Sequence, residues 1–317
     1  MSIEICVAEN TGGGYNLIGC VSGAASIGRS VSVTKFPRTT VGGISVPRLI
    51  CGTNWFLGYS HTSRAKDLLI RELFDTPAKM ARVVEVFARR GCNAVMGPLS
   101  EFVSEALREA EQRTGSPMIW VCTPGHTDAD KPDAWRPAVD AAKKLGAAFC
   151  FPHQCITDPR IDLVNRRLDP ELSEYLNYVR EMEMIPGLST HTPDAIICAD
   201  ASGADVESYT LPYNCAGFLC HVETDWAQKV IHEAHKPVMT IKPLAAGRVL
   251  PPTGLSFVWN TIRDCDMVTV GTMSTYEAEE VIEISLACLE HRKADVGLQF
   301  TRSKTSLARG DSHPFRE

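Results

Sequence analysis

A regular alternation of short apolar runs with amphipathic helical stretches constrains the fold of this chain more than any other feature. Parallel strands need a long crossover between them, and that crossover is usually a helix. Eight such units in succession fit a closed barrel better than an open sheet, so the fold class that we predict is α/β, a (β/α)8 TIM barrel. The predicted strands are Arg48–Gly52, Ala94–Gly97, Met118–Cys122, Ala148–Pro152, Ile185–Leu188, Val206–Leu211, Val238–Lys242 and Met267–Gly271.

Several of the helical stretches carry recognisable start and stop residues. Thr76 is placed as an N-cap before Pro77, and Gly91 and Gly146 are typical of the residue just beyond a helix end. No glycine-rich dinucleotide fingerprint opens the first unit, which argues against a doubly wound sheet. The predicted helices with clear periodicity are Thr76–Arg90, Pro170–Met184, Asp225–Ala234 and Thr275–Leu289, the last opening with a threonine cap before acidic residues.

The 317 residues exceed the roughly 250 of a typical barrel, so we expect additional segments at its ends. We predict an N-terminal β extension at 1–47, the barrel at 48–292 and a polar C-terminal tail at 293–317. The stretch Cys6–Pro47 predicts one or two β-hairpins that either plug the bottom of the barrel or extend an edge. The tail is either a disordered end or an arm on a neighbouring copy, which leaves a homo-oligomer open.

Composition excludes several classes of partner. With 32 basic and 38 acidic residues the formal charge is −6, so no overall basic surface is expected for nucleic acid or an anionic membrane. Met1–Cys20 lacks the pattern of a signal peptide, and no run reaches the ~18 apolar residues of a membrane span. Most of the 12 cysteines lie in apolar segments, as is typical of a reducing compartment. We therefore predict a cytoplasmic protein with a small-molecule substrate and neither a nucleic-acid nor a membrane partner.

In a barrel, catalytic residues come from the carboxyl ends of the strands and from the loops that follow. Tyr59 and His61 follow the first predicted strand and His153 follows the fourth, and these three are the candidate catalytic residues. Histidine exchanges protons near neutral pH, and tyrosine can donate one. His61 and His153, with His221 and Glu223 after the sixth strand, also form a candidate divalent-metal site. The alternative is that His221 is a loop residue beside a helix start.

The loops after the seventh and eighth strands supply small residues, hydroxyl groups and a cation. They predict a phosphate or nucleotide site made of backbone amides, or else only tight turns. Lys242 has three interpretations: a Schiff-base lysine, a phosphate contact or a side chain that extends to solvent. Thr190–Asp194 predicts a helix N-terminus, so His191 is left out of the candidate site. The candidate cofactor-binding residues of these loops are Lys242, Arg248, Gly271, Thr272 and Ser274.

Five short stretches stand out by their order and spacing: Phe149–His153, Gly187–Asp194, Leu211–Asn214, Lys242–Arg248 and Val270–Glu280. Together with Val46–Leu49 they resemble the aldo-keto reductases. That resemblance implies a (β/α)8 barrel with an N-terminal β-hairpin. It also implies that Tyr213 is similar to the aromatic platform under a nicotinamide ring, and that Lys242 lies near the pyrophosphate of the cofactor.

The resemblance also assigns the catalytic tetrad of the family to positions in this chain, and most of them differ. Met96 stands where the family has aspartate, no tyrosine lies between Met96 and Ser104, and Pro124 stands where lysine is expected. Only His153 is retained. The basic residue that would pair with the 2′-phosphate of NADPH is also missing from Met273–Thr275. The resemblance therefore implies the fold but not ordinary carbonyl reduction, because no activated tyrosine is present to protonate a carbonyl oxygen.

We predict a TIM-barrel enzyme that acts on a small polyhydroxylated or carbonyl substrate by proton transfer, as an isomerase, epimerase or lyase. The sequence does not identify a cofactor, and it favours a divalent metal over NAD(P). His153 and His61 would serve as acid/base groups or metal ligands, and Lys242 and Arg248 would hold an anionic group. Two alternatives stay open: an NAD(P)-dependent oxidoreductase of aldo-keto reductase type with a rearranged site that uses Tyr59, and a non-catalytic ligand-binding barrel.

Overall fold

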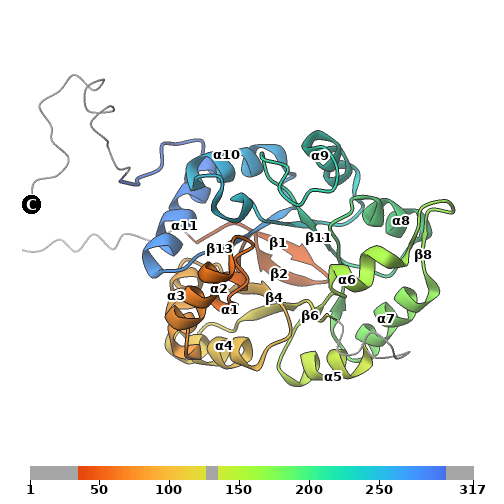
Figure 1. The fold of residues 1–317 in the computed structure, drawn as a ribbon, viewed down its shortest axis with the longest axis horizontal. Helices are drawn as coiled ribbons and strands as arrows, with labels where there is room; N and C mark the ends of the chain where they lie inside the picture. The colour runs from red at the N-terminus through yellow and green to blue at the C-terminus, as the bar shows by residue number, and fades with distance from the viewer. Residues whose placement is uncertain (1–34, 126–134, 298–317) are drawn as a thin grey trace, which may run out of the picture. The chain divides into compact units, whose positions relative to one another are not determined.

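A ring of parallel strands forms the centre of the structure (Figure 1), a computed structural model that describes residues 35–125 and 135–297. Most of the predicted N-terminal extension and of the polar tail, at 1–34 and 298–317, lies outside the described residues. The strands of the ring are β3 (Leu49–Gly52), β4 (Ala94–Gly97), β5 (Ile119–Cys122), β6 (Phe149–Cys150), β9 (Ile185–Pro186), β10 (Leu188–Ser189), β11 (Tyr209–Pro212), β12 (Val238–Ile241) and β13 (Met267–Gly271).

The ring closes through one interrupted strand. The sheet runs in the order β10, β11, β12, β13, β3, β4, β5, β6, β9, with every neighbouring pair parallel. β9 and β10 are consecutive pieces of one strand, separated only by Gly187. A Cβ atom at Gly187 would lie 2.5 Å from both Phe151 Cζ and Ser208 O, so a side chain does not fit there. The predicted (β/α)8 barrel is confirmed, with this strand as the fifth of eight.

The strands are buried on both faces, which explains their continuous apolar sequence. Because side chains alternate along a strand, one set points into the barrel and the other toward the helices. The inner cluster includes Ile50, Met96 and Met239, whereas Val95 and Trp120 belong to the outer one.

Helices surround the ring in the alternating order that the sequence predicts (Figure 1). The predicted helices agree with the observed ones within three residues at each end, and Gly91 and Gly146 have the expected positive φ. One detail is corrected, because the N-cap of the last helix is Ser274 rather than Thr275. No helix of the described residues is both long and apolar enough to cross a lipid bilayer. The outer helices are α3 (Pro77–Arg89), α4 (Glu101–Thr114), α5 (Arg136–Lys144), α7 (Pro170–Glu181), α8 (Asp194–Ser202), α9 (Thr224–Glu233), α10 (Pro251–Thr261) and α11 (Thr275–Leu289).

The loops at the carboxyl ends of the strands contain several additional helices and short strands. They carry several residues of the site described below, because these loops are where barrels place their chemistry. These elements are α1 (Asn54–Leu57), α2 (Arg64–Leu73), α6 (Gln154–Thr157), η1 (Asp158–Arg160), β7 (Ile161–Asp162), β8 (Arg167–Leu168) and η2 (Ala245–Gly247).

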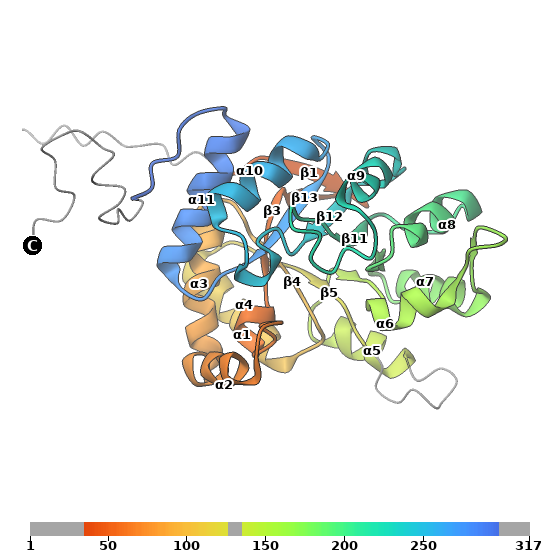
Figure 2. The same ribbon diagram turned by 45° about the horizontal axis from the view of Figure 1, so that its top comes forward.

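An antiparallel hairpin, β1 (Arg38–Val41) and β2 (Ile44–Pro47), closes the amino end of the ring. Val41 and Val46 belong to the same buried cluster as Ile50 inside the barrel. Within the described residues, the hairpin is therefore a plug rather than an edge extension. Figure 2 separates the two ends of the ring: β1 lies near one end, and α1, α2 and α6 lie toward the other.

Candidate functional site

A cavity of about 930 Å³ opens at the carboxyl ends of the strands. We call it the carboxyl-end cavity. Its wall includes residues at or just after each of the eight strands, so the whole ring contributes to it. A site of this size at this end of a barrel is where substrates bind in enzymes of the fold. Two glutamates line its α11 side, and its other titratable side chains are Tyr59, His61, Lys66, His153, Cys155, His191 and Lys242.

The structure brings six of the predicted site residues to this cavity and leaves five outside its wall. Those that line it are Tyr59, His61, His153, Lys242, Gly271 and Thr272. Those that do not are Tyr213, His221, Glu223, Arg248 and Ser274.

Lys242 reaches the carboxyl-end cavity through an unusual backbone conformation. Strand alternation places Ile241 in the barrel and would turn the next side chain toward the helices. Lys242 instead has φ of 60°, in the left-handed region that costs a residue with a Cβ atom about 1–2 kcal/mol. Ala245 and Ala246 in the same loop also have positive φ. Such strain is typical of segments whose side chains are held for function.

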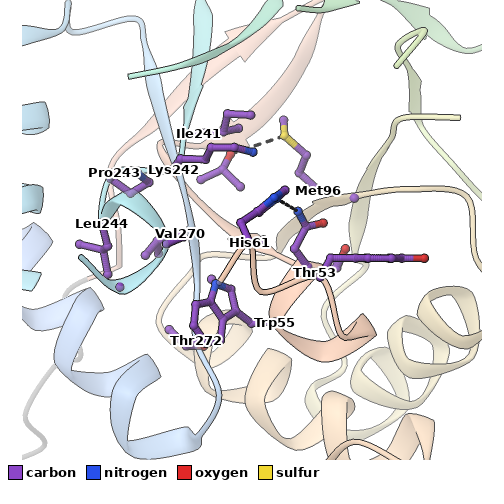
Figure 3. A pocket seen from close by; sticks show the side chains of 18 of the residues that line it. Thr53, Trp55, His61, Met96, Ile241, Lys242, Pro243, Leu244, Val270 and Thr272 are labelled. Carbon is purple, nitrogen blue, oxygen red and sulfur yellow. Dashed lines mark hydrogen bonds between the residues drawn. The ribbon is translucent and has the colours of Figure 1, made fainter. Parts of the chain in front are cut away.

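The ammonium group of Lys242 is poorly compensated. No carboxylate among the described residues lies within ion-pair distance of Lys242 Nζ. Burial lowers the pKa of Lys242 to about 8, because the charged form loses its hydration. Figure 3 shows Lys242, His61 and Met96 converging on the same space. A larger fraction of Lys242 is therefore a neutral amine near neutral pH than for an ordinary lysine.

Two further histidines face this lysine. Burial, and then the charge on Lys242, lower the pKa of His191 to about 3. The same two causes lower the pKa of His61, whose Nε2 lies 3.4 Å from Asn54 Nδ2. Both imidazoles are consequently neutral at pH 7 and can accept a proton.

His153, the one retained tetrad residue, is paired with a cysteine. Its Nδ1 accepts a hydrogen bond from Cys155 N at 3.4 Å and lies 3.2 Å from Cys155 Sγ. Because a backbone N–H only donates, the neutral ring carries its proton on Nε2. His153 also caps α6, which fixes the ring at the cavity wall.

The predicted metal site is not assembled. His221 and Glu223 are exposed, and His221 Nδ1 lies 3.3 Å from Thr192 Oγ1. Throughout residues 35–125 and 135–297, no three or more His, Cys, Asp and Glu side chains are grouped so that they could hold a metal ion. The set His61, His153, His221 and Glu223 therefore does not form the predicted donor cluster, because His221 and Glu223 stay in the loop before α9.

Tyr213 and Arg248 have structural roles away from the cavity wall. Tyr213 continues the outward-facing side of β11, is fully buried, and lies 3.0 Å from Thr261 on α10. It is therefore not placed as an aromatic platform in the carboxyl-end cavity. The Arg248 guanidinium lies over the Phe218 ring at 4.2 Å and donates to His61 O at 3.3 Å. Arg248 thus positions the segment that carries His61.

The residues present do not fit a bound nicotinamide cofactor. The start of α11, where a phosphate would bind, already has internal partners. Ser274 accepts from Glu277 N, and Glu277 Oε2 accepts from Met273 N at 2.6 Å. The Glu277 and Glu280 carboxylates also line this side of the cavity and would repel a phosphate. A Cβ atom at Gly271 would lie 2.5 Å from Trp55, so this glycine makes room for the indole.

Two of the positions that the resemblance assigns to the reductase tetrad lie within the described residues. Met96, at the aspartate position, points inward at the end of β4 and its sulfur is approached by the Thr210 and Thr269 hydroxyls at 3.9 and 3.7 Å. Pro124, at the lysine position, accepts a hydrogen bond from His153 N. A thioether and a proline provide neither the charge nor the acid of the tetrad.

Sequence reasoning missed His191. Its helix was predicted to begin at Pro193, but Pro193 is the N-cap and α8 begins at Asp194. His191 lies two residues after Ser189, the end of β10, just as His153 follows β6. The position of His191 just after a strand could therefore have identified it as a site residue. The helix-capping pattern beside it led to its exclusion.

Comparisons with known proteins support the fold. No family model matches the chain, and no curated protein matches it. A solved structure from Pseudomonas aeruginosa described as an aldo-keto reductase is 15% identical, with a TM-score of 0.56, over 82% of this chain and 99% of its own. The aldo-keto reductase AKR11C1 from Bacillus halodurans is 14% identical, with a TM-score of 0.52, over 86% and 99%. The chain therefore shares the barrel fold of these aldo-keto reductase structures.

Proposed function

We propose that this chain is an enzyme that moves a proton at the carbon next to a carbonyl group of a small polyhydroxylated substrate. The observation that carries the proposal is that His61, His153, His191 and Lys242 line one cavity at the carboxyl end of the barrel. His61 and His153 are the acid/base groups, and Lys242 engages the carbonyl group. The reaction class is isomerisation, epimerisation or carbon–carbon cleavage.

Solvent hydrogen exchange tests this proposal. The protein is incubated in D2O with glycolaldehyde or dihydroxyacetone, and proton NMR follows deuterium entering the carbon next to the carbonyl. We expect the wild-type protein to accelerate exchange and His153→Gln to lower the rate by about 10²–10⁴-fold.

His235→Gln is the matched control, because His235 is exposed and precedes β12 at the opposite end of the ring. That variant should exchange like the wild type. Exchange no faster than in buffer, or an undiminished rate in His153→Gln, would contradict the proposal.

A further inference from the structure

We propose that Lys242 forms a Schiff base with an aldehyde or ketone substrate bound in the carboxyl-end cavity. This inference rests on the proposed function and deepens it, because it names the group that reacts and the class of substrate. A covalent lysine selects aldehydes and ketones over esters, carboxylic acids and phosphates.

The position of Lys242 is the first argument. The left-handed conformation at this residue turns the side chain from the helix layer into the cavity, at a cost in backbone energy. Hydrogen bonds within the loop, from Ala245 N to Lys242 O and from Gly247 N to Leu244 O, both at 2.9 Å, hold that conformation. A lysine that only extended to solvent would not need it.

The surroundings of the amine are the second argument. Ile241, Met96 and Pro243 line the cavity beside it, and among the described residues no carboxylate is close enough to pair with it. A phosphate-binding or structural lysine is better served by a charged form, whereas these surroundings favour the neutral amine that attacks a carbonyl. Cys220, from the loop after β11, opposes the lowering of the Lys242 pKa. The charge on Lys242 in turn lowers the pKa of His191 and of His61.

The chemistry balances with the groups at hand. The neutral Nζ attacks the carbonyl carbon, a C–N bond forms, and the carbonyl oxygen takes a proton to give a carbinolamine. The C–O bond then breaks, and both hydrogens of the amine leave with that oxygen as one water molecule. His153, which carries a proton on Nε2, lies in the cavity wall and relays these protons. The imine nitrogen then takes up one proton from water, and the protonated imine acidifies the adjacent C–H bond. No oxidant or reductant is needed.

Reductive trapping tests the assignment on the intact wild-type chain. The protein is treated with glycolaldehyde and sodium cyanoborohydride, digested, and mapped by mass spectrometry. At about pH 7 we expect Lys242 to be labelled at least about tenfold faster than exposed lysines, because its lowered pKa leaves more neutral amine. Its labelling rate should level off above pH about 8, whereas that of exposed lysines keeps rising.

Two lysine variants sharpen the test. Lys242→Arg keeps the positive charge but lacks a reactive amine, so the fast-labelled site should disappear. Lys66→Arg is the matched control: Lys66 lies at the same cavity, 5.5 Å over the Trp55 ring, and its replacement should leave labelling at Lys242 unchanged. Circular dichroism of both variants checks that they fold.

The outcomes separate this inference from the proposed function. Labelling at Lys242 without deuterium exchange keeps the Schiff base and removes the proton transfer. Exchange without preferential labelling of Lys242 overturns the Schiff base and leaves the proton transfer. Labelling that is absent, or spread evenly over the lysines, also overturns the assignment.

Discussion

At the scale of single residues, the carboxyl-end cavity combines a poorly compensated cation with imidazoles that stay neutral. Burial, and then the charge on Lys242, lower the pKa of both His61 and His191, so both rings resist taking up a proton. The free energy for holding these neutral forms comes from the rest of the fold. Removing one of them should therefore change stability in a way that depends on pH.

His191→Asn should weaken the dependence of stability on pH in acid. The His191 pKa is about 3 in the folded protein and 6.5 for the ordinary residue, so the unfolded chain binds an extra proton between these values. Stability consequently falls as pH drops through that window. As pH falls from about 7 to about 4.5, the free energy of unfolding of the wild type should drop by about 1–2 kcal/mol more than that of the variant. This range allows for the partial exposure of His191, which weakens the effect.

Urea unfolding at the two pH values measures this difference. The facing groups Lys242, His221, His153 and His61 are unchanged in the variant, so the effect belongs to His191. His291→Asn, at an exposed residue, serves as the control and should leave the pH dependence as it is. If the stabilities of wild type and His191→Asn changed with pH in parallel, the pKa of His191 would not be lowered in the folded protein, which would contradict the prediction.

At the scale of elements, two interruptions of regular structure define the barrel and its site. The fifth strand breaks at Gly187 between β9 and β10, where the chain passes close to Phe151 and Ser208. The loop after β12 breaks the strand alternation at Lys242. The first interruption allows the ring to close, and the second brings a functional side chain into the cavity.

Gly187→Ala should destabilise the protein by about 1–3 kcal/mol, because a methyl group would overlap a buried ring and a backbone carbonyl. Denaturant unfolding checks it. Gly297→Ala is the matched control, since nothing lies within 4 Å of a Cβ atom there. A Gly187→Ala protein as stable as the control would mean that the fifth strand moves to make room.

At the scale of the whole molecule, the two ends of the barrel have different tasks. The amino end is held by a buried network in which Asp266 accepts from Val238 N and from the Arg263 guanidinium, while Arg48 donates to Asp266 O. The carboxyl end keeps unpaired hydroxyls and a desolvated amine. Stability and chemistry should therefore respond to different substitutions.

Asp266→Asn should lower the free energy of unfolding by about 3–5 kcal/mol, because it leaves the Arg263 charge without its partner. Lys242→Met should instead be at least as stable as wild type, since it removes a desolvated cation, yet lose the trapped adduct. Thermal unfolding and the trapping assay on both variants check this separation. Loss of labelling in a folded Asp266→Asn protein would contradict it.

Most of the fold was predictable from the sequence because its information is local. Apolar periodicity located every strand of the ring, and Gly91 and Gly146 located helix ends, since these patterns depend on neighbouring residues alone. The rule that loops after strands form the site found His61, His153 and Lys242. The same alternation, applied to Tyr209, Leu211 and Tyr213, would have shown that Tyr213 faces the helices.

The sequence by itself determined the barrel and the end at which its cavity opens. Only the tertiary structure decided which loop residues reach that cavity: Lys242 and His191 do, whereas His221, Glu223 and Arg248 do not line it. The physical reason is that a side chain beyond the end of a strand is directed by its loop backbone. That backbone is set by hydrogen bonds and packing between segments far apart in the chain, which no local pattern records.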